Sequence, residues 1–143
     1  RPQIEQELLE HFGPKVLHIV LGCTDTQNDS GAKDSPGSPK ESWAERKTAY
    51  LKHLEQLDPT DPLSASVLLV SNADKLHNAR SILRDWQQVG EAVWERFKGG
   101  KEGSLWYYQR LAEIFGRRPS PLSEELQRVV RTLEDPRKDC SVC

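Results

Sequence analysis

Hydrophobic residues recur along most of the chain at the three- to four-residue spacing of one face of an α-helix. Pro2 and Pro62 suit first helical turns, and Gly13 and Gly90 suit helix ends. Residues 15–23 are almost continuously apolar, so a strand is the alternative to a helix there. The pattern predicts an all-α fold with helices over residues 3–12, 15–23, 42–57, 62–89, 105–115 and 123–134.

Two serines mark predicted helix starts. Ser42, followed by Glu45, has the spacing of a capping box, and Ser104 can cap the helix over 105–115. Residues 25–41 contain almost no hydrophobic side chain and many Gly, Pro, Ser and Asp, which predicts a long flexible loop. We therefore expect one domain over residues 1–134, followed by a flexible tail at 135–143.

Composition places the chain among soluble globular proteins, with 36% hydrophobic and 29% charged residues in 143. Twenty Lys and Arg against 22 Asp and Glu leave a net charge of -2, which argues against binding to a nucleic acid polymer or an anionic membrane surface. No apolar run approaches the ~20 residues that span a bilayer. Three cysteines do not form a disulfide framework, so the cytoplasm is the predicted location. Because the chain begins with Arg1 and contains no methionine, we expect further sequence upstream.

The helix predicted over 62–89 carries polar residues in its middle. Asp74 follows the apolar run 67–70, and Asn78 lies one helical turn further on. A carboxylate buried there without a partner would be costly, so it needs a cation, hydrogen-bond donors or water. A metal ion would satisfy it. The alternative, which helical spacing alone favours, is that Asp74 pairs with Lys75 or Arg80 or faces solvent.

The segment NADKLHNARSIL, residues 72–83, resembles the segment that closes the metal site of HD-domain phosphohydrolases, in particular the hydrolase domains of the RelA/SpoT type. The stretches HFGPKVLHIVLGCTD, WAERKTAYLKHL, DWQQVGEAVWERFKGGKEGSLWYYQRL and ELQRVVRTLE also resemble small bacterial HD-domain proteins, in the same order. The resemblance covers nearly the whole chain. It implies an HD-domain-like helical bundle whose first helices, with the family's first histidine and its His-Asp pair, would precede residue 1.

This resemblance implies a function for the intact protein. Asp74 matches the final metal ligand, Asn78 a position near the nucleoside of the substrate or the water network of the site, and Arg80 a position that more often braces the helix. Mixed His and Asp ligands suit a divalent ion, for which Mn(II) is favoured, and Mg(II) and Fe(II) are the alternatives. The expected activity is metal-dependent hydrolysis of a nucleotide phosphate or pyrophosphate, with guanosine tetraphosphate favoured, and the chain alone should be inactive. The alternative is a non-catalytic nucleotide-binding or regulatory module.

A phosphorylated substrate requires local positive charge. Arg46 and Lys47 follow the predicted loop, and Lys101 lies with Lys98 in the glycine-rich segment KGGKEGS, ahead of a helix N-terminus where backbone N–H groups favour phosphate. An ordinary turn between helices is the alternative for that segment. Tyr107 offers a ring on which a base could stack, although an aromatic residue at the start of a helix can equally be core.

Overall fold

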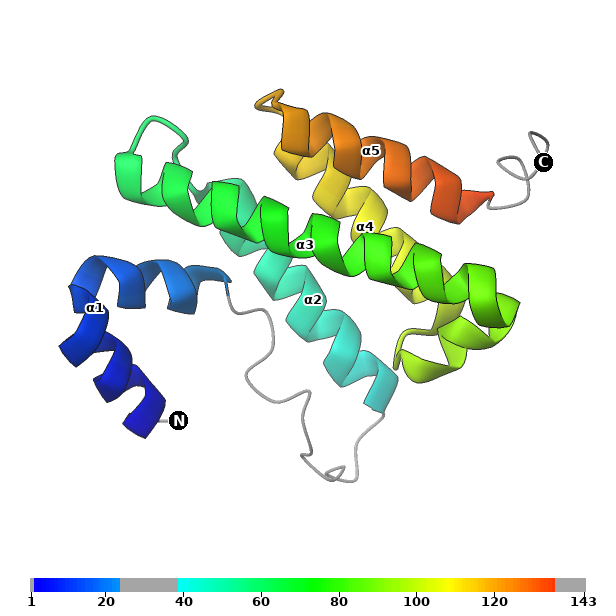
Figure 1. The fold of residues 1–143 in the computed structure, drawn as a ribbon, viewed down its shortest axis with the longest axis horizontal. Coiled ribbons are helices and arrows are strands. Elements are labelled where there is room, and N and C mark those ends of the chain that lie inside the picture. The colour runs from blue at the N-terminus through cyan, green and yellow to red at the C-terminus, as the bar shows by residue number, and fades with distance from the viewer. Residues whose placement is uncertain (1, 24–38, 136–143) are drawn as a thin grey trace.

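The longest helix of the molecule runs across its centre, and the other helices pack around it (Figure 1). The computed structural model describes residues 2–23 and 39–135. The central helix, α3, spans Pro62–Val89. The Asp61 carboxylate accepts a hydrogen bond from the Ser64 backbone N–H at 3.0 Å, and Gly90, with φ 67°, follows the last turn. The predicted extent of this helix is confirmed.

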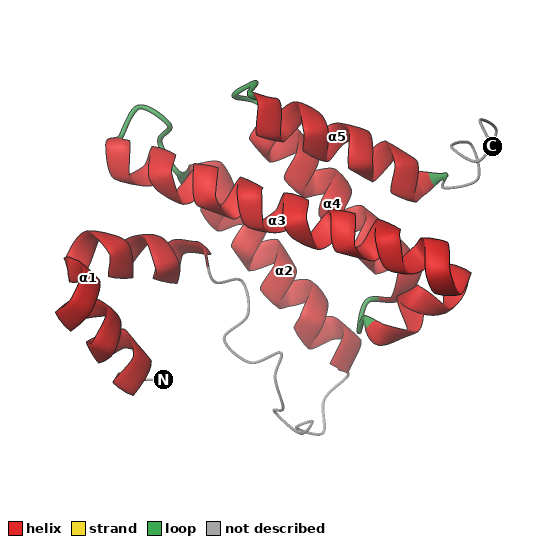
Figure 2. Ribbon diagram, in the orientation of Figure 1, coloured by secondary structure: helices red, strands yellow, loops and turns green. Residues whose placement is uncertain are grey.

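The remaining elements are helical too, and the described residues contain no strand (Figure 2). The predicted all-α fold is therefore confirmed, and the strand alternative for residues 15–23 is wrong. None of the described helices combines the length and apolar character needed to cross a bilayer. The elements are α1 (Pro2–Cys23), α2 (Pro39–Gln56), the 3₁₀ helix η1 (Gly90–Arg96), α4 (Gly100–Gly116) and α5 (Pro121–Glu134).

The first helix is divided in two, as its sequence predicts. Gly13 has φ 86° and ψ 172°, outside the helical range, and Pro14 begins the second half. The almost continuous apolar run of this second half predicts a buried helix, but Val16, Val20 and Leu21 are all exposed. The reason is that α1 packs on α3 near its own C-terminal end, where the thiol of Cys23 donates to the Val67 carbonyl at 3.5 Å.

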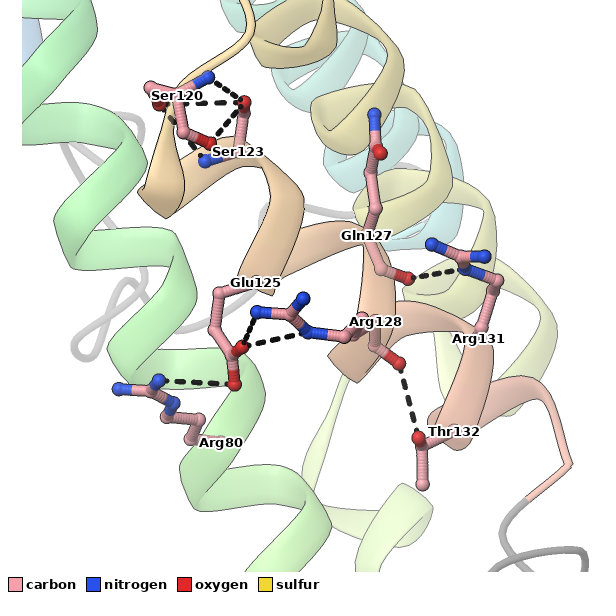
Figure 3. A network of polar contacts seen from close by, with 8 residues as sticks. All are labelled: Arg80, Ser120, Ser123, Glu125, Gln127, Arg128, Arg131 and Thr132. Atoms are coloured by element: carbon pink, nitrogen blue, oxygen red, sulfur yellow. Dashed lines mark hydrogen bonds and ion pairs between the residues drawn. The ribbon is translucent and has the colours of Figure 1, made fainter.

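Helix starts differ from the serine caps that the sequence suggests. The helix α2 is described from Pro39, three residues ahead of Ser42, and α4 begins at Gly100, which leaves Ser104 buried inside the helix. The helix α5 begins two residues earlier than predicted, because Ser120 and Ser123 form a reciprocal capping box (Figure 3). The predicted loop, apart from residues 39–41 in α2, and nearly all of the predicted tail lie outside the described residues.

The hydrophobic core lies between α2, α3, α4 and α5. In α2 the helical spacing of apolar residues predicts that Trp43, Tyr50, Leu51, Leu54 and Leu57 face inward. The first four are buried, and Leu57 is half-buried. In α3 the helical spacing predicts a packing stripe made of Leu69, Ala73, Leu76, Ala79, Leu83 and Trp86. This prediction is only partly right: Leu76 and Ala79 are buried and Leu83 and Trp86 are half-buried, but Leu69 and Ala73 are exposed. The other fully buried large side chains of the core are Leu111, Leu126, Leu133 and Val93.

An ion-pair network ties α5 to α3 (Figure 3). One Nη of Arg80 lies 3.1 Å from a carboxylate oxygen of Glu125, and Arg128 pairs with the same carboxylate from within α5. These two guanidinium groups, Arg128 first and Arg80 second, hold the pKa of Glu125 below its ordinary value of 4.5. Arg80 thus braces the helix, in agreement with the role that the family resemblance implies.

Candidate functional site

A cavity of about 360 Å³ opens where α2, α3, η1 and α4 meet. Its size falls in the range of small-molecule sites in proteins. We call it the cationic cavity, because four of its lining side chains carry positive charge. Its lining residues are Trp43, Lys47, Lys75, Asn78, Arg96, Phe97, Lys98, Ser104, Tyr107 and Tyr108.

Helical spacing brings these residues to one place. Trp43 and Lys47 are four residues apart on α2, and Lys75 and Asn78 are three apart on α3, so each pair shares a helix face. In α4 the same rule aligns Ser104 with Tyr107 and Tyr108. The three helices therefore present their polar and aromatic positions to a common cavity.

Two of the cationic side chains are buried against aromatic rings. Lys47 is 7% exposed and Lys75 is 4% exposed. The Lys47 ammonium lies 4.8 Å from the centroid of the Tyr107 ring, and the Lys75 ammonium lies 5.4 Å from that of Tyr50. No Asp or Glu is among the described residues that line the cavity. The cavity thus suits an anion, although the chain carries a net charge of -2.

The glycine-rich segment KGGKEGS shapes the cavity wall. A Cβ atom on Gly99 would lie 2.5 Å from the indole of Trp43, and one on Gly103 would lie 3.1 Å from it. Gly100, with φ 64°, makes the turn into α4. These glycines therefore make a tight turn and provide the space in which the Trp43 ring packs. The lysines on either side have different surroundings, because Lys98 lines the cavity and Lys101 does not.

A second hollow, of about 370 Å³, adjoins the cationic cavity. It shares Asn78, Arg96, Phe97 and Tyr108 with the cavity, and its other lining residues are Ser81, Ile82 and Asp85. At the boundary, an Nη of Arg96 donates to a carboxylate oxygen of Asp85 at 2.8 Å. We call this second space the adjoining hollow.

Asp74, the predicted metal ligand, lies at the edge of this region. Its side chain is 52% exposed, and one of its carboxylate oxygens lies 3.4 Å from the Lys75 ammonium. Within residues 2–23 and 39–135, no three His, Cys, Asp or Glu side chains form a group that could hold a metal ion. The described residues alone therefore do not provide a metal site. The contact between Asp74 and Lys75 agrees with the alternative in which these two side chains pair. The role of Asp74 as a ligand stays a prediction.

On the side of α3 next to Asp74, hydrogen bonds made by Tyr50 of α2 connect α2 to both α3 and α1. The Tyr50 hydroxyl lies 3.0 Å from that of Ser71 and donates to the Cys23 carbonyl at 3.3 Å. Burial raises the pKa of the Cys23 thiol above its ordinary value of 9.0. This cysteine is therefore a protonated thiol near neutral pH, which makes it a poor nucleophile or metal ligand.

The predicted substrate residues divide into two groups. Lys47, Asn78 and Tyr107 line the cationic cavity, so the structure brings three of the five together. Arg46 is half-buried but is not among the lining residues. Lys101 lies outside the cavity, and its ammonium is 3.1 Å from a carboxylate oxygen of Glu91 on η1.

Several residues of the cavity were missed by sequence reasoning. Lys75 lies in a charged run that is typical of a solvated helix face, and only its packing on Tyr50 reveals its burial. No sequence pattern pointed to Arg96 as a site residue, because its position depends on how η1 packs against α3. Trp43 was correctly predicted as an inward residue, but its position in the cavity wall follows from the glycines opposite.

The described residues form an all-helical domain with a cavity lined by four cationic and four aromatic side chains. The chain belongs to the HD domain family, since the family model described as HD domain matches residues 2–105. Members of this family are in general metal-dependent phosphohydrolases. No curated protein matches the chain.

Proposed function

We propose that the cationic cavity binds the phosphate groups of a nucleotide, and that the chain supplies this binding site to a metal-dependent phosphohydrolase. The observation that carries the proposal is the gathering of four cationic side chains, from α2, α3 and the η1–α4 region, around one cavity. Arginine and lysine are the residues that proteins use to bind phosphate, and their effect is strongest where water is partly excluded. The burial of Lys47 and Lys75 meets that condition.

The rest of the cavity suits a nucleoside better than a bare anion. Phe97 is half-buried and offers aromatic surface, and Tyr107 and Tyr108 add largely buried rings to the wall. The Asn78 amide can both donate and accept hydrogen bonds. Together with the resemblance to hydrolase domains of the RelA/SpoT type, these features favour guanosine tetraphosphate as the ligand. Its two pyrophosphate groups would make use of several cations at once.

In this proposal Asp74 contributes one ligand to a divalent ion, for which we favour Mn(II), and the other ligands come from outside the described residues. Such an ion, when bound, lowers the pKa of a coordinated water and neutralises charge on a phosphoryl oxygen. The residues of this chain bind and orient the phosphate groups. Lys75 connects the two functions, since it lines the cavity and contacts the Asp74 carboxylate.

The binding step can be tested without any metal. Calorimetric titration of the chain with guanosine tetraphosphate in the presence of EDTA should show binding to a single site. The Lys47→Gln variant should weaken the affinity by about tenfold or more, the value of one hydrogen bond to a charged group.

The matched control is Lys101→Gln, which removes the same charge outside the cavity and should leave the affinity unchanged. Absence of binding, or equal losses in the two variants, would contradict the proposal. Thermal unfolding of both variants shows whether the fold is retained.

A non-catalytic nucleotide-binding module is the second candidate, and the contact between Asp74 and Lys75 favours it. Release of phosphate or pyrophosphate by the full-length protein from a panel of nucleotides, with and without Mn(II), separates the two. An enzyme should hydrolyse a nucleotide with Mn(II) and lose that activity in the Asp74→Ala variant. A module should bind the nucleotide equally well in both proteins and hydrolyse it in neither.

A further inference from the structure

Arg96 occupies the boundary between the cationic cavity and the adjoining hollow, and it lines both. Its side chain is 56% exposed, so packing alone does not fix it. Two contacts hold it in place. One Nη donates to Asp85 at 2.8 Å, and the guanidinium carbon lies 5.6 Å from the centroid of the Phe97 ring.

We infer that Asp85 is a positioning residue for anion binding, which acts by holding Arg96 at the mouth of the cationic cavity. The inference rests on the proposed phosphate-binding role of that cavity. A guanidinium carries five N–H donors, and its bond to Asp85 is made by one Nη, so donors on Nε and on the other Nη remain for a phosphate oxygen. An exposed arginine loses side-chain entropy when it binds a ligand, and one that a carboxylate already holds loses less.

A simpler electrostatic view gives the opposite expectation. The Asp85 carboxylate is a negative charge beside an anion site, so its removal should strengthen anion binding if charge alone matters. If Asp85 acts by positioning Arg96, its removal should weaken binding. The two views therefore predict opposite changes in anion affinity when Asp85 is removed, so the direction of the change is more decisive than its size.

The probe is inorganic pyrophosphate, titrated by calorimetry into the wild-type chain and its variants without metal. Asp85→Asn should weaken the affinity about three- to fivefold, which is the usual free energy of an exposed ion pair expressed as a ratio of dissociation constants. Asp85→Glu keeps a carboxylate and should recover most of the loss. Glu91→Gln is the matched control, because it removes the same charge from a neighbouring ion pair, with Lys101, that does not line the cavity. It should not weaken binding.

The action through Arg96 is tested in a second background. Arg96→Gln should weaken pyrophosphate binding by more than Asp85→Asn does, and Asp85→Asn should cause no further loss when Arg96 is already replaced. Equal or tighter binding by Asp85→Asn in the wild-type background would overturn the inference alone. The inference would also be overturned if Asp85→Asn still weakened pyrophosphate binding in the Arg96→Gln background. Failure of the wild-type chain to bind pyrophosphate would overturn the proposed function and this inference together.

Discussion

Lys75 shows most directly how a single residue serves the site. Its side chain is almost wholly removed from water, against the ring of Tyr50 and beside the carboxylate of Asp74. Burying an ammonium costs desolvation energy, which contacts such as those with Tyr50 and Asp74 offset. Lys75 also lines the cationic cavity, so the proposed function gives it a second role as a contact for phosphate.

Replacing Lys75 with methionine should therefore separate stability from binding. A methionine has nearly the same length, so Lys75→Met should leave the free energy of unfolding unchanged or raise it by about 1 kcal/mol. Its affinity for pyrophosphate should fall about tenfold or more. Urea unfolding and calorimetric titration of the same preparation measure the two quantities. A large loss of stability would indicate that Lys75 is chiefly structural.

Gly99 is a second residue whose replacement gives a clear expectation. Its backbone, with φ -78° and ψ -8°, is one that alanine adopts freely, so any cost comes from contact with the indole of Trp43. Gly99→Ala should lower the free energy of unfolding by about 1–3 kcal/mol, as is usual when a packed site is overfilled. Urea unfolding measures the loss. Adding Trp43→Phe removes the contacting ring atoms and should reduce the cost of the alanine, and equal costs in both backgrounds would contradict this explanation.

At the scale of elements, the pairing of α5 with α3 depends partly on the charge of Glu125. The carboxylate accepts from Arg128 in its own helix and meets Arg80 on α3, so it is more easily ionised in the folded chain than in the unfolded one. A group with a depressed pKa stabilises the fold above its ordinary pKa. That contribution is lost as the pH falls through the lowered value.

The Glu125→Gln variant should therefore lose stability in a pH-dependent way. Near pH 7 it should unfold with a free energy about 0.5–1 kcal/mol below that of the wild type, the usual size of a partly exposed ion pair. The difference should shrink as the pH falls below the ordinary value of 4.5 and vanish below the lowered pKa of the folded state, where the wild-type carboxyl is neutral too. Urea unfolding across this range measures it. Glu113→Gln, which affects a pair with Arg110 inside α4, should show a smaller difference.

The elements were predictable wherever local sequence decides them. Backbone preferences of single residues fix three helix boundaries. The kink in α1 lies at Gly13, α3 begins at Pro62, and α3 ends before Gly90. Ser42 and Ser104 misled the prediction because a serine only caps a helix if the preceding residues leave the helical range. Here α2 and α4 both begin further back along the chain, so Ser42 and Ser104 lie inside helices.

The site was less predictable than the elements, for a reason that individual residues make plain. Lys47, Asn78 and Tyr107 could be chosen because each lies on a helix face that the sequence defines or matches a motif of the family. The places of Lys75 and Arg96 depend on contacts with Tyr50 and Asp85, which lie on other elements. Lys101 looks equivalent to Lys98 in the sequence, yet it pairs with Glu91.

At the scale of the whole molecule, four cationic side chains gather around one cavity while the chain as a whole is slightly acidic. A net charge of -2 gives no extended field for a polyanion, whereas the cationic cavity offers several charges to a compact one. The domain should thus favour small phosphorylated molecules over nucleic acid polymers.

A competition experiment checks this preference. A single-stranded oligonucleotide of about twelve bases, at the same phosphate concentration as pyrophosphate, should displace less than about a tenth of bound pyrophosphate, because it lacks a continuous basic surface to follow. Pyrophosphate itself should bind more weakly as the salt concentration rises. The titration is carried out by calorimetry with and without the oligonucleotide. Effective displacement would indicate a nucleic acid site that the charge distribution does not predict.

The packing of Trp43 against Gly99 and Gly103 places an indole in the wall of the cationic cavity itself. An indole in such a position changes its emission when a charged molecule enters beside it. Occupancy of the site can then be followed optically in the unlabelled protein, with Trp43→Phe as the silent reference against the chain's other three tryptophans. A wide range of phosphorylated metabolites could be screened in this way on small samples, before any of them is known to be a substrate.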